Sequence, residues 1–170
     1  MKNKLMPTIV LSVICFTVAL LLATVNYFTA PIIEKAQQEK VQKTLQAVLK
    51  DGENFVEIST EGLSDNVISA YTEDGGGYVF QIETKGYKTG LVIMCGITSD
   101  GKIAGCEVIK SSETMSAEKS LGSRYVGRDL ASVKGKPEII ASSTLTSEAY
   151  HTAVETALRS FEFLTNKEDK

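Results

Sequence analysis

Residues 78–109 read YVFQIETKGYKTGLVIMCGITSDGKIAGCEVI, and this stretch decides the fold. It contains three runs rich in β-branched and apolar residues, YVFQIET, LVIMCGI and KIAGCEVI, which are typical of strands. The segments between them, residues 85–90 and 99–101, carry the glycines and the aspartate of turns. Because short turns of this kind join neighbouring antiparallel strands, the stretch predicts an antiparallel meander.

Two cysteines, Cys95 and Cys106, flank the second turn. A two-residue loop at Asp100 and Gly101 would place them opposite each other and permit a disulfide. A bulge at Gly101 after a type I turn would instead shift the register by one residue and turn the two sulfurs to opposite faces. We favour the bulge, and therefore expect two free thiols in the core.

Downstream, residues 147–164 carry apolar side chains at helical spacing, which predicts an amphipathic helix packed on the sheet. These side chains are Tyr150, Ala153, Val154, Ala157, Leu158, Phe161 and Leu164. The polar segment 111–136 predicts a loop region with one short helix near residues 117–121, and the run Gly75 to Gly77 predicts a turn. The expected class is α+β, a twisted antiparallel sheet with a packed C-terminal helix.

The N-terminal part has a different character, because residues 6–33 contain no charged side chain. A run of about 20 apolar residues suffices to cross a bilayer. Lys2 and Lys4 precede this run, which favours a cytoplasmic N-terminus and an exported domain. We expect an uncleaved single-pass anchor in the cell (inner) membrane, with a cleaved signal peptide as the alternative.

Pro31 is suited to the first turn of a helix, and the pattern after it predicts a stalk helix through Leu49. The expected organisation is therefore a cytoplasmic tail and transmembrane anchor in 1–30, a stalk helix in 31–50 and an extracytoplasmic domain in 51–170.

Composition argues against several kinds of function. The net charge is −3, and all 21 acidic residues follow the apolar run, which argues against nucleic acid as a partner. Three cysteines and one histidine without ligand spacing argue against a metal site. No nucleophile elbow, phosphate loop or dinucleotide fingerprint occurs, and His151 is expected to be a surface or half-buried helix residue. No catalytic residue is predicted.

The segment before the C-terminal helix, residues 138–147 (EIIASSTLTS), is rich in hydroxyls. The first N–H groups of a helix lack partners and its dipole is positive there, so an anion attached near Thr144 would be stabilised. The alternative is that the hydroxyls of Thr144, Thr146 and Ser147 only cap the helix.

The order of anchor, stalk, GYVFQIETKGY, LVIMCGITSDGKIAGCEVIKSSET and IIASSTLTSEAYHTAV resembles the FMN-binding domain family, in particular the G subunit of Rnf complexes. In that family the motif Asp-x-x-Ser/Thr-Gly-Ala-Thr receives FMN from a flavin transferase, through a phosphoester on the final threonine. The matching position is Thr144, preceded here by Glu138, Ala141, Ser142 and Ser143. The resemblance implies further FMN contacts by Ser143, Leu145, Thr146, Ser147, Glu113 and Thr114.

The resemblance also implies a role. It is that of an electron-transfer subunit, not a catalyst alone, in an Rnf-type complex that moves electrons between ferredoxin and NAD while pumping sodium ions or protons. Other membrane subunits and the flavin transferase would be its partners. The alternatives are a protein like the C subunit of the sodium-translocating NADH:quinone oxidoreductase, a scaffold domain without flavin, and a free-standing extracytoplasmic flavoprotein.

Overall fold

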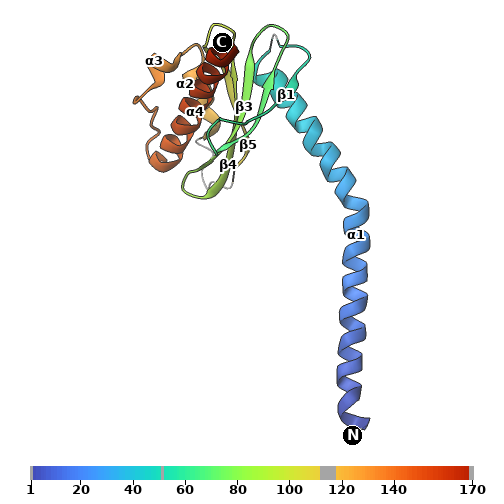
Figure 1. The fold of residues 1–170 in the computed structure, drawn as a ribbon. Coiled ribbons are helices and arrows are strands. Elements are labelled where there is room, and N and C mark those ends of the chain that lie inside the picture. The colour runs from blue at the N-terminus through green and yellow to red at the C-terminus, as the bar shows by residue number, and fades with distance from the viewer. Residues whose placement is uncertain (1, 51, 112–117, 169–170) are drawn as a thin grey trace. The chain divides into compact units, whose positions relative to one another are not determined.

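The structure, a computed structural model, describes residues 2–50, 52–111 and 118–168 (Figure 1). Its first element, α1 (Lys2–Val48), is one helix that contains both the apolar run and the expected stalk. Within α1, Ile9–Ile33 is 25 residues long with a mean hydropathy of 2.5, which is long and apolar enough to cross a membrane. The chain divides into two compact units, Met1–Lys40 and Val41–Lys170, and the second contains the sheet.

The second unit is built on a five-stranded antiparallel sheet whose strands follow the order of the chain. The strands are β1 (Val56–Ile58), β2 (Val67–Thr72), β3 (Tyr78–Lys85), β4 (Thr89–Ile97) and β5 (Ile103–Lys110). The predicted meander is confirmed as β3 to β5, whereas β1 and β2 were not predicted. A register shift between Val67 and Ser69 interrupts the alternation of β2, and β1 is a short, mostly exposed edge strand.

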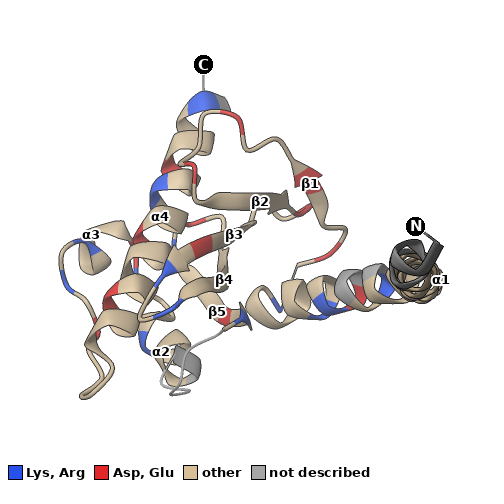
Figure 2. Cartoon of the chain, turned by 90° about the horizontal axis from the view of Figure 1, so that it is seen from below, with Lys and Arg blue, Asp and Glu red and all other residues tan. Residues whose placement is uncertain are grey.

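Three helices follow the sheet in the chain: α2 (Glu118–Tyr125), α3 (Leu130–Val133) and α4 (Thr144–Glu168). The predicted C-terminal helix is confirmed, although α4 begins at Thr144 rather than Ser147. Six of the seven apolar residues expected on its packed face are buried, and Leu164 is half-buried. In the view of Figure 2, basic and acidic positions are interspersed along α4.

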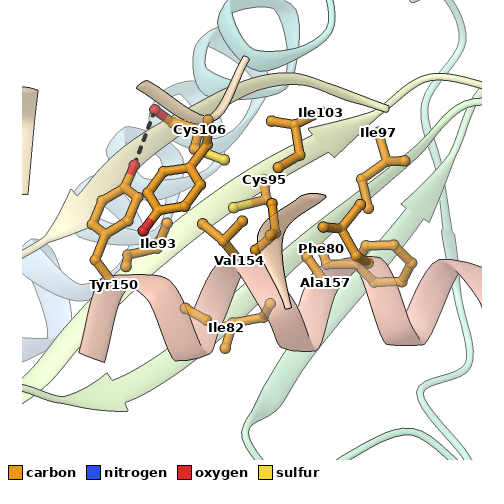
Figure 3. Close-up of a cluster of buried hydrophobic side chains, with 14 of the residues drawn as sticks. Phe80, Ile82, Ile93, Cys95, Ile97, Ile103, Cys106, Tyr150, Val154 and Ala157 are labelled. Atoms are coloured by element: carbon orange, nitrogen blue, oxygen red, sulfur yellow. Dashed lines mark hydrogen bonds between the residues drawn. The ribbon is translucent and has the colours of Figure 1, made fainter. Parts of the chain in front are cut away.

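The main core lies between α4 and one face of the sheet (Figure 3). Side chains that alternate along β3 and β4, such as Phe80, Ile82 and Ile93, are fully buried there against Val154 and Ala157. The other face of the sheet is covered by the last turns of α1, where Leu45 and Val48 pack against Val79 and Met94. Helices therefore pack on both faces of the antiparallel sheet, which confirms the α+β class.

The β4–β5 hairpin corrects the expected cysteine geometry. Gly101 has φ +76° and its N–H donates to Thr98 O at 2.9 Å, so the predicted bulge after the turn is present. A second register shift follows between Gly96 and Ile97, and it cancels the first. Cys95 and Cys106 are consequently direct cross-strand partners on the same face, and the expectation of opposite faces was wrong.

Both sulfurs lie in the main core as free thiols. Burial is the largest cause that raises the pKa of the Cys106 thiol well above its usual value, so the thiol stays protonated. Tyr150 closes the same region from α4 by donating its hydroxyl to Cys106 O at 3.3 Å (Figure 3).

Candidate functional site

The hydroxyl-rich segment forms a tight turn that leads directly into α4. Ser143 N–H donates to Ile140 O at 3.0 Å, which closes the turn around Ala141 and Ser142. Ser142 has φ +66°, a left-handed conformation that glycine adopts without cost and other residues rarely adopt. The structure thus keeps, with a serine, the backbone shape for which the family motif uses glycine. We call residues 140–144 the acceptor turn.

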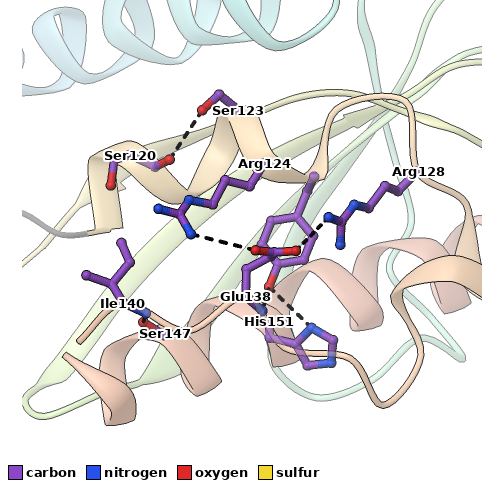
Figure 4. A network of polar contacts seen from close by, with 9 residues as sticks. Ser120, Ser123, Arg124, Arg128, Glu138, Ile140, Ser147 and His151 are labelled. Atoms are coloured by element: carbon purple, nitrogen blue, oxygen red, sulfur yellow. Dashed lines mark hydrogen bonds and ion pairs between the residues drawn. The ribbon is translucent and has the colours of Figure 1, made fainter. Parts of the chain in front are cut away.

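Ser147 fixes the acceptor turn to the helix that follows. Its buried hydroxyl accepts from Ile140 N–H at 3.1 Å and donates to Ser143 O at 2.8 Å (Figure 4). Because this one side chain serves the main chain on both sides of the turn, Ser147 has a structural role. The FMN contact of Ser147 that the resemblance implied stays a prediction.

Burial separates the hydroxyls that the sequence offered as candidates. Thr144 is exposed, as is Leu145 beside it, whereas Ser143 and Thr146 are 8% and 3% exposed. Ser142 is exposed as well. A modifying enzyme can therefore reach the Thr144 hydroxyl directly, while Thr146 would require the helix end to open.

Thr144 also occupies the position where an anion gains most from the helix. It is the first residue of α4, and Ser147 N–H makes the first bond within the helix, to Ser143 O at 2.9 Å. The dipole of α4 is positive at this end, which favours a negative charge near Thr144. The start of α4 is therefore a suitable place for a phosphate ester.

Glu138, which begins the segment, is held by two arginines that come from α2 and the loop after it (Figure 4). Arg128 Nη2 lies 2.6 Å from Glu138 Oε1, and Arg124 Nη1 lies 3.7 Å from Oε2. The main chain of Glu138 is also bound, because its N–H donates to Tyr125 Oη at 3.0 Å. These three partners of Glu138 were not predicted from the sequence. The sequence indicated only that a carboxylate in this segment needs a cation.

His151 is buried behind this network, and the expectation of a surface or half-buried residue was wrong. Its Nδ1 lies 3.3 Å from Tyr125 Oη, and its Nε2 lies 3.6 Å from Glu155. Tyr125 Oη therefore connects the main chain of Glu138 to the His151 ring. Burial lowers the pKa of His151 and outweighs the opposing effect of Glu155.

The remaining predicted residues cannot be placed, since Glu113 and Thr114 lie in 112–117, outside the residues that the structure describes. Cavities of the second unit lie elsewhere. One of about 490 Å³ is lined by residues that include Leu49, Glu73 and Thr98, and one of about 280 Å³ lies between Asp129 and Phe161. Neither is lined by the acceptor turn.

The conformation of Ser142 gives a first prediction. Ser142→Gly should raise the free energy of unfolding by about 1 kcal/mol, because it removes the cost of holding a side chain in the left-handed region. Thermal unfolding of the full chain in detergent measures the change. Asn54→Gly is the control: Asn54 also has positive φ, but asparagine tolerates it and Asn54 bonds to Asp74, so the gain should be absent. Equal gains at both positions would contradict the assignment of strain to Ser142.

Comparison with known proteins identifies the domain. A model of the FMN-binding domain matches residues 86–159, a range that contains β4, β5, α2, α3 and the acceptor turn. The G subunit of a proton-translocating ferredoxin:NAD(+) oxidoreductase complex from Clostridium ljungdahlii is 25% identical over 61% of this chain. The G subunit of a Na(+)-translocating ferredoxin:NAD(+) oxidoreductase complex from Acetobacterium woodii is 27% identical over 92% of it.

The chain spans 55% of the length of the first relative and 90% of the second. The match to the family covers the strands and helices that build the site, and both relatives carry the name of the same subunit. Residues 86–159 thus match the FMN-binding domain, and the chain is similar to the G subunits of ferredoxin:NAD(+) oxidoreductase complexes.

Proposed function

We propose that this chain is a membrane-anchored electron-transfer flavoprotein subunit of an Rnf-type complex, and that it carries FMN as a phosphoester of Thr144. The observation that carries the proposal is the exposed Thr144 hydroxyl at the first position of α4, within the matched FMN-binding domain. The flavin supplies the redox chemistry, and the protein supplies attachment and position. This division of labour requires no acid–base pair in the chain.

Attachment is a group transfer at Thr144. The Thr144 oxygen forms the new bond to phosphorus, and a phosphoanhydride bond of an activated FMN donor breaks to release the leaving phosphate group. The hydroxyl proton passes to a base of the flavin transferase. The protein's own contribution is to hold the hydroxyl exposed and to place the resulting negative charge at a helix N-terminus.

The anchor supports a place in a membrane complex. Ile9–Ile33 is apolar enough to span, and both relatives are named as subunits of translocating complexes. We propose that the N-terminus is cytoplasmic and that the domain lies outside the cytoplasm, because Lys2 and Lys4 flank the span. An impermeant thiol reagent should label a cysteine placed at Lys167 in intact cells, and labelling only after lysis would reverse this topology.

Covalent FMN is tested on the full chain expressed together with a flavin transferase. We expect flavin fluorescence to stay with the protein on a denaturing gel, and the mass of one FMN phosphoester on the peptide that contains Thr144. Protein without that mass, despite an active transferase, would refute attachment and favour the scaffold alternative. In that case Ala141, Ser142 and Ser143, which depart from the motif, are the first positions to restore.

A further inference from the structure

Glu138 is fixed to the segment 124–128 by both its side chain and its main chain. The carboxylate pairs with Arg128 at 2.6 Å and approaches Arg124 at 3.7 Å, while the N–H donates to Tyr125 at 3.0 Å. Figure 4 shows the two guanidinium groups reaching the carboxylate from opposite sides. The carboxylate is only 26% exposed, so solvent screens this pair less than a pair on the open surface.

The partner segment is itself rigidly held. Tyr125 is fully buried, its ring stacks on Tyr150 of α4 with centroids 6.0 Å apart, and its hydroxyl meets His151. Arg128 lies over the same ring, 5.7 Å from the centroid. A residue bound to Tyr125 and Arg128 is thus bound to the core of the domain.

The chain before Glu138 has no comparable attachment to the core, since residues 134–137 are all exposed. After Glu138 the main chain reaches the acceptor turn within two residues, and Ser147 holds the far side of the turn. The acceptor turn is therefore held by Glu138 upstream and Ser147 downstream, in addition to the packing of Ile140 against the main core. A strained residue such as Ser142 persists only where its surroundings fix it in this way.

We infer that Glu138 is a positioning residue: its ion pair with Arg128 holds the acceptor turn in the conformation that presents Thr144. Glu138 acts through α2 and the loop after it, not by contact with the cofactor. The expected effect of Glu138 on flavin attachment rests on the proposed function.

The test compares Glu138→Gln and Arg128→Gln in the full chain by hydrogen exchange of the Ile140 and Ser143 amides. Both variants lose the charged pair, so both should speed exchange at these amides by roughly tenfold or more. The double variant should exchange little faster than either single variant, because each single variant already removes the ion pair. Glu138→Asp, which keeps the charge, should recover at least part of the protection.

Arg159→Gln is the matched control. It breaks an ion pair of similar length, Arg159 to Glu155 at 2.5 Å, on the part of α4 that does not bind the acceptor turn. Its Ile140 and Ser143 amides should exchange as in the wild type, although an ion pair of α4 is lost. The rate of FMN attachment should drop in Glu138→Gln and Arg128→Gln but not in Arg159→Gln.

The outcomes separate the two proposals. Unchanged exchange at Ile140 and Ser143 in Glu138→Gln would overturn the positioning role, whatever happens to the flavin. Faster exchange in these variants of a chain that never takes up FMN would uphold the positioning role and refute the proposed function. Faster exchange with an unchanged rate of FMN attachment would show that attachment does not depend on a preformed turn. It would overturn the inferred link between the positioning role of Glu138 and FMN attachment.

Discussion

Thr144→Ala is expected to abolish covalent FMN, while Thr146→Val is expected to keep it. The two threonines lie two residues apart at the start of α4, but Thr144 is exposed and Thr146 is 3% exposed. A transferase that needs its acceptor in solution can use only the first without opening the helix. Flavin fluorescence on a denaturing gel and intact mass of the full chain measure the result.

The effects of these variants on domain stability and on FMN attachment should differ. Thr144 is a helix residue rather than the residue before the helix, so its loss should cost less than the roughly 1 kcal/mol typical of a lost N-cap. Thr146→Val removes a buried hydroxyl and should destabilise the domain more, yet leave the acceptor intact. Thr144→Ser keeps a hydroxyl and should retain part of the flavin.

Two results would contradict this assignment. Flavin retained by Thr144→Ala would place the ester on another hydroxyl, and the exposed Ser142 would be the first to examine. Flavin lost from both variants would mean that attachment depends on the fold of the helix start more than on one oxygen. Peptide mapping of the modified residue distinguishes these cases.

The strand pattern was predictable from the sequence where alternation was regular and turn residues were clear. This held for β3 to β5 and for the apolar face of α4, whose buried residues lie at the expected spacing. It failed for β2, where the register shift near Ser69 disrupts the period, and for β1, which is too short for any period. Such short or irregular strands are fixed by pairing with a neighbour, and pairing is not visible in a local pattern.

The cysteine register shows a second kind of limit. One bulge could be predicted from Gly101, because the turn chemistry is local. The compensating shift beside Gly96 could not be predicted, because no turn residue or local pattern marks it. A Cβ at Gly96 would lie 2.6 Å from Val48 O, so the strand and the helix end approach closely there.

Thr144 could be proposed as the acceptor from the sequence, but the contacts that hold its segment could not be predicted. Thr144 stands out by its place in a hydroxyl-rich segment before a helix, which a local pattern can show. Arg128 and Tyr125 lie 10 and 13 residues from Glu138 in the chain and join it only through the packing of α2 on β5. The fold supplies that proximity.

Gly122→Ala tests this dependence of the site on the packing of α2, and it should destabilise the domain by about 1–3 kcal/mol. A Cβ at Gly122 would collide with the Cys106 carbonyl and come within 3.0 Å of Tyr150 Oη, so α2 would have to move away from β5. Helix propensity acts in the opposite direction, because alanine favours a helix by about 1 kcal/mol over glycine. A net loss of stability would therefore come from the contact alone.

Ser123→Ala on the exposed side of the same helix is the control, and it should be neutral or slightly stabilising. Thermal unfolding of the full chain in detergent gives the stabilities, and hydrogen exchange at Ile140 reports on the acceptor turn. Because Arg124 and Tyr125 move with α2, Gly122→Ala should also weaken the hold on Glu138 and speed exchange at Ile140. A stable Gly122→Ala variant with a protected Ile140 amide would mean that α2 can shift without releasing Glu138.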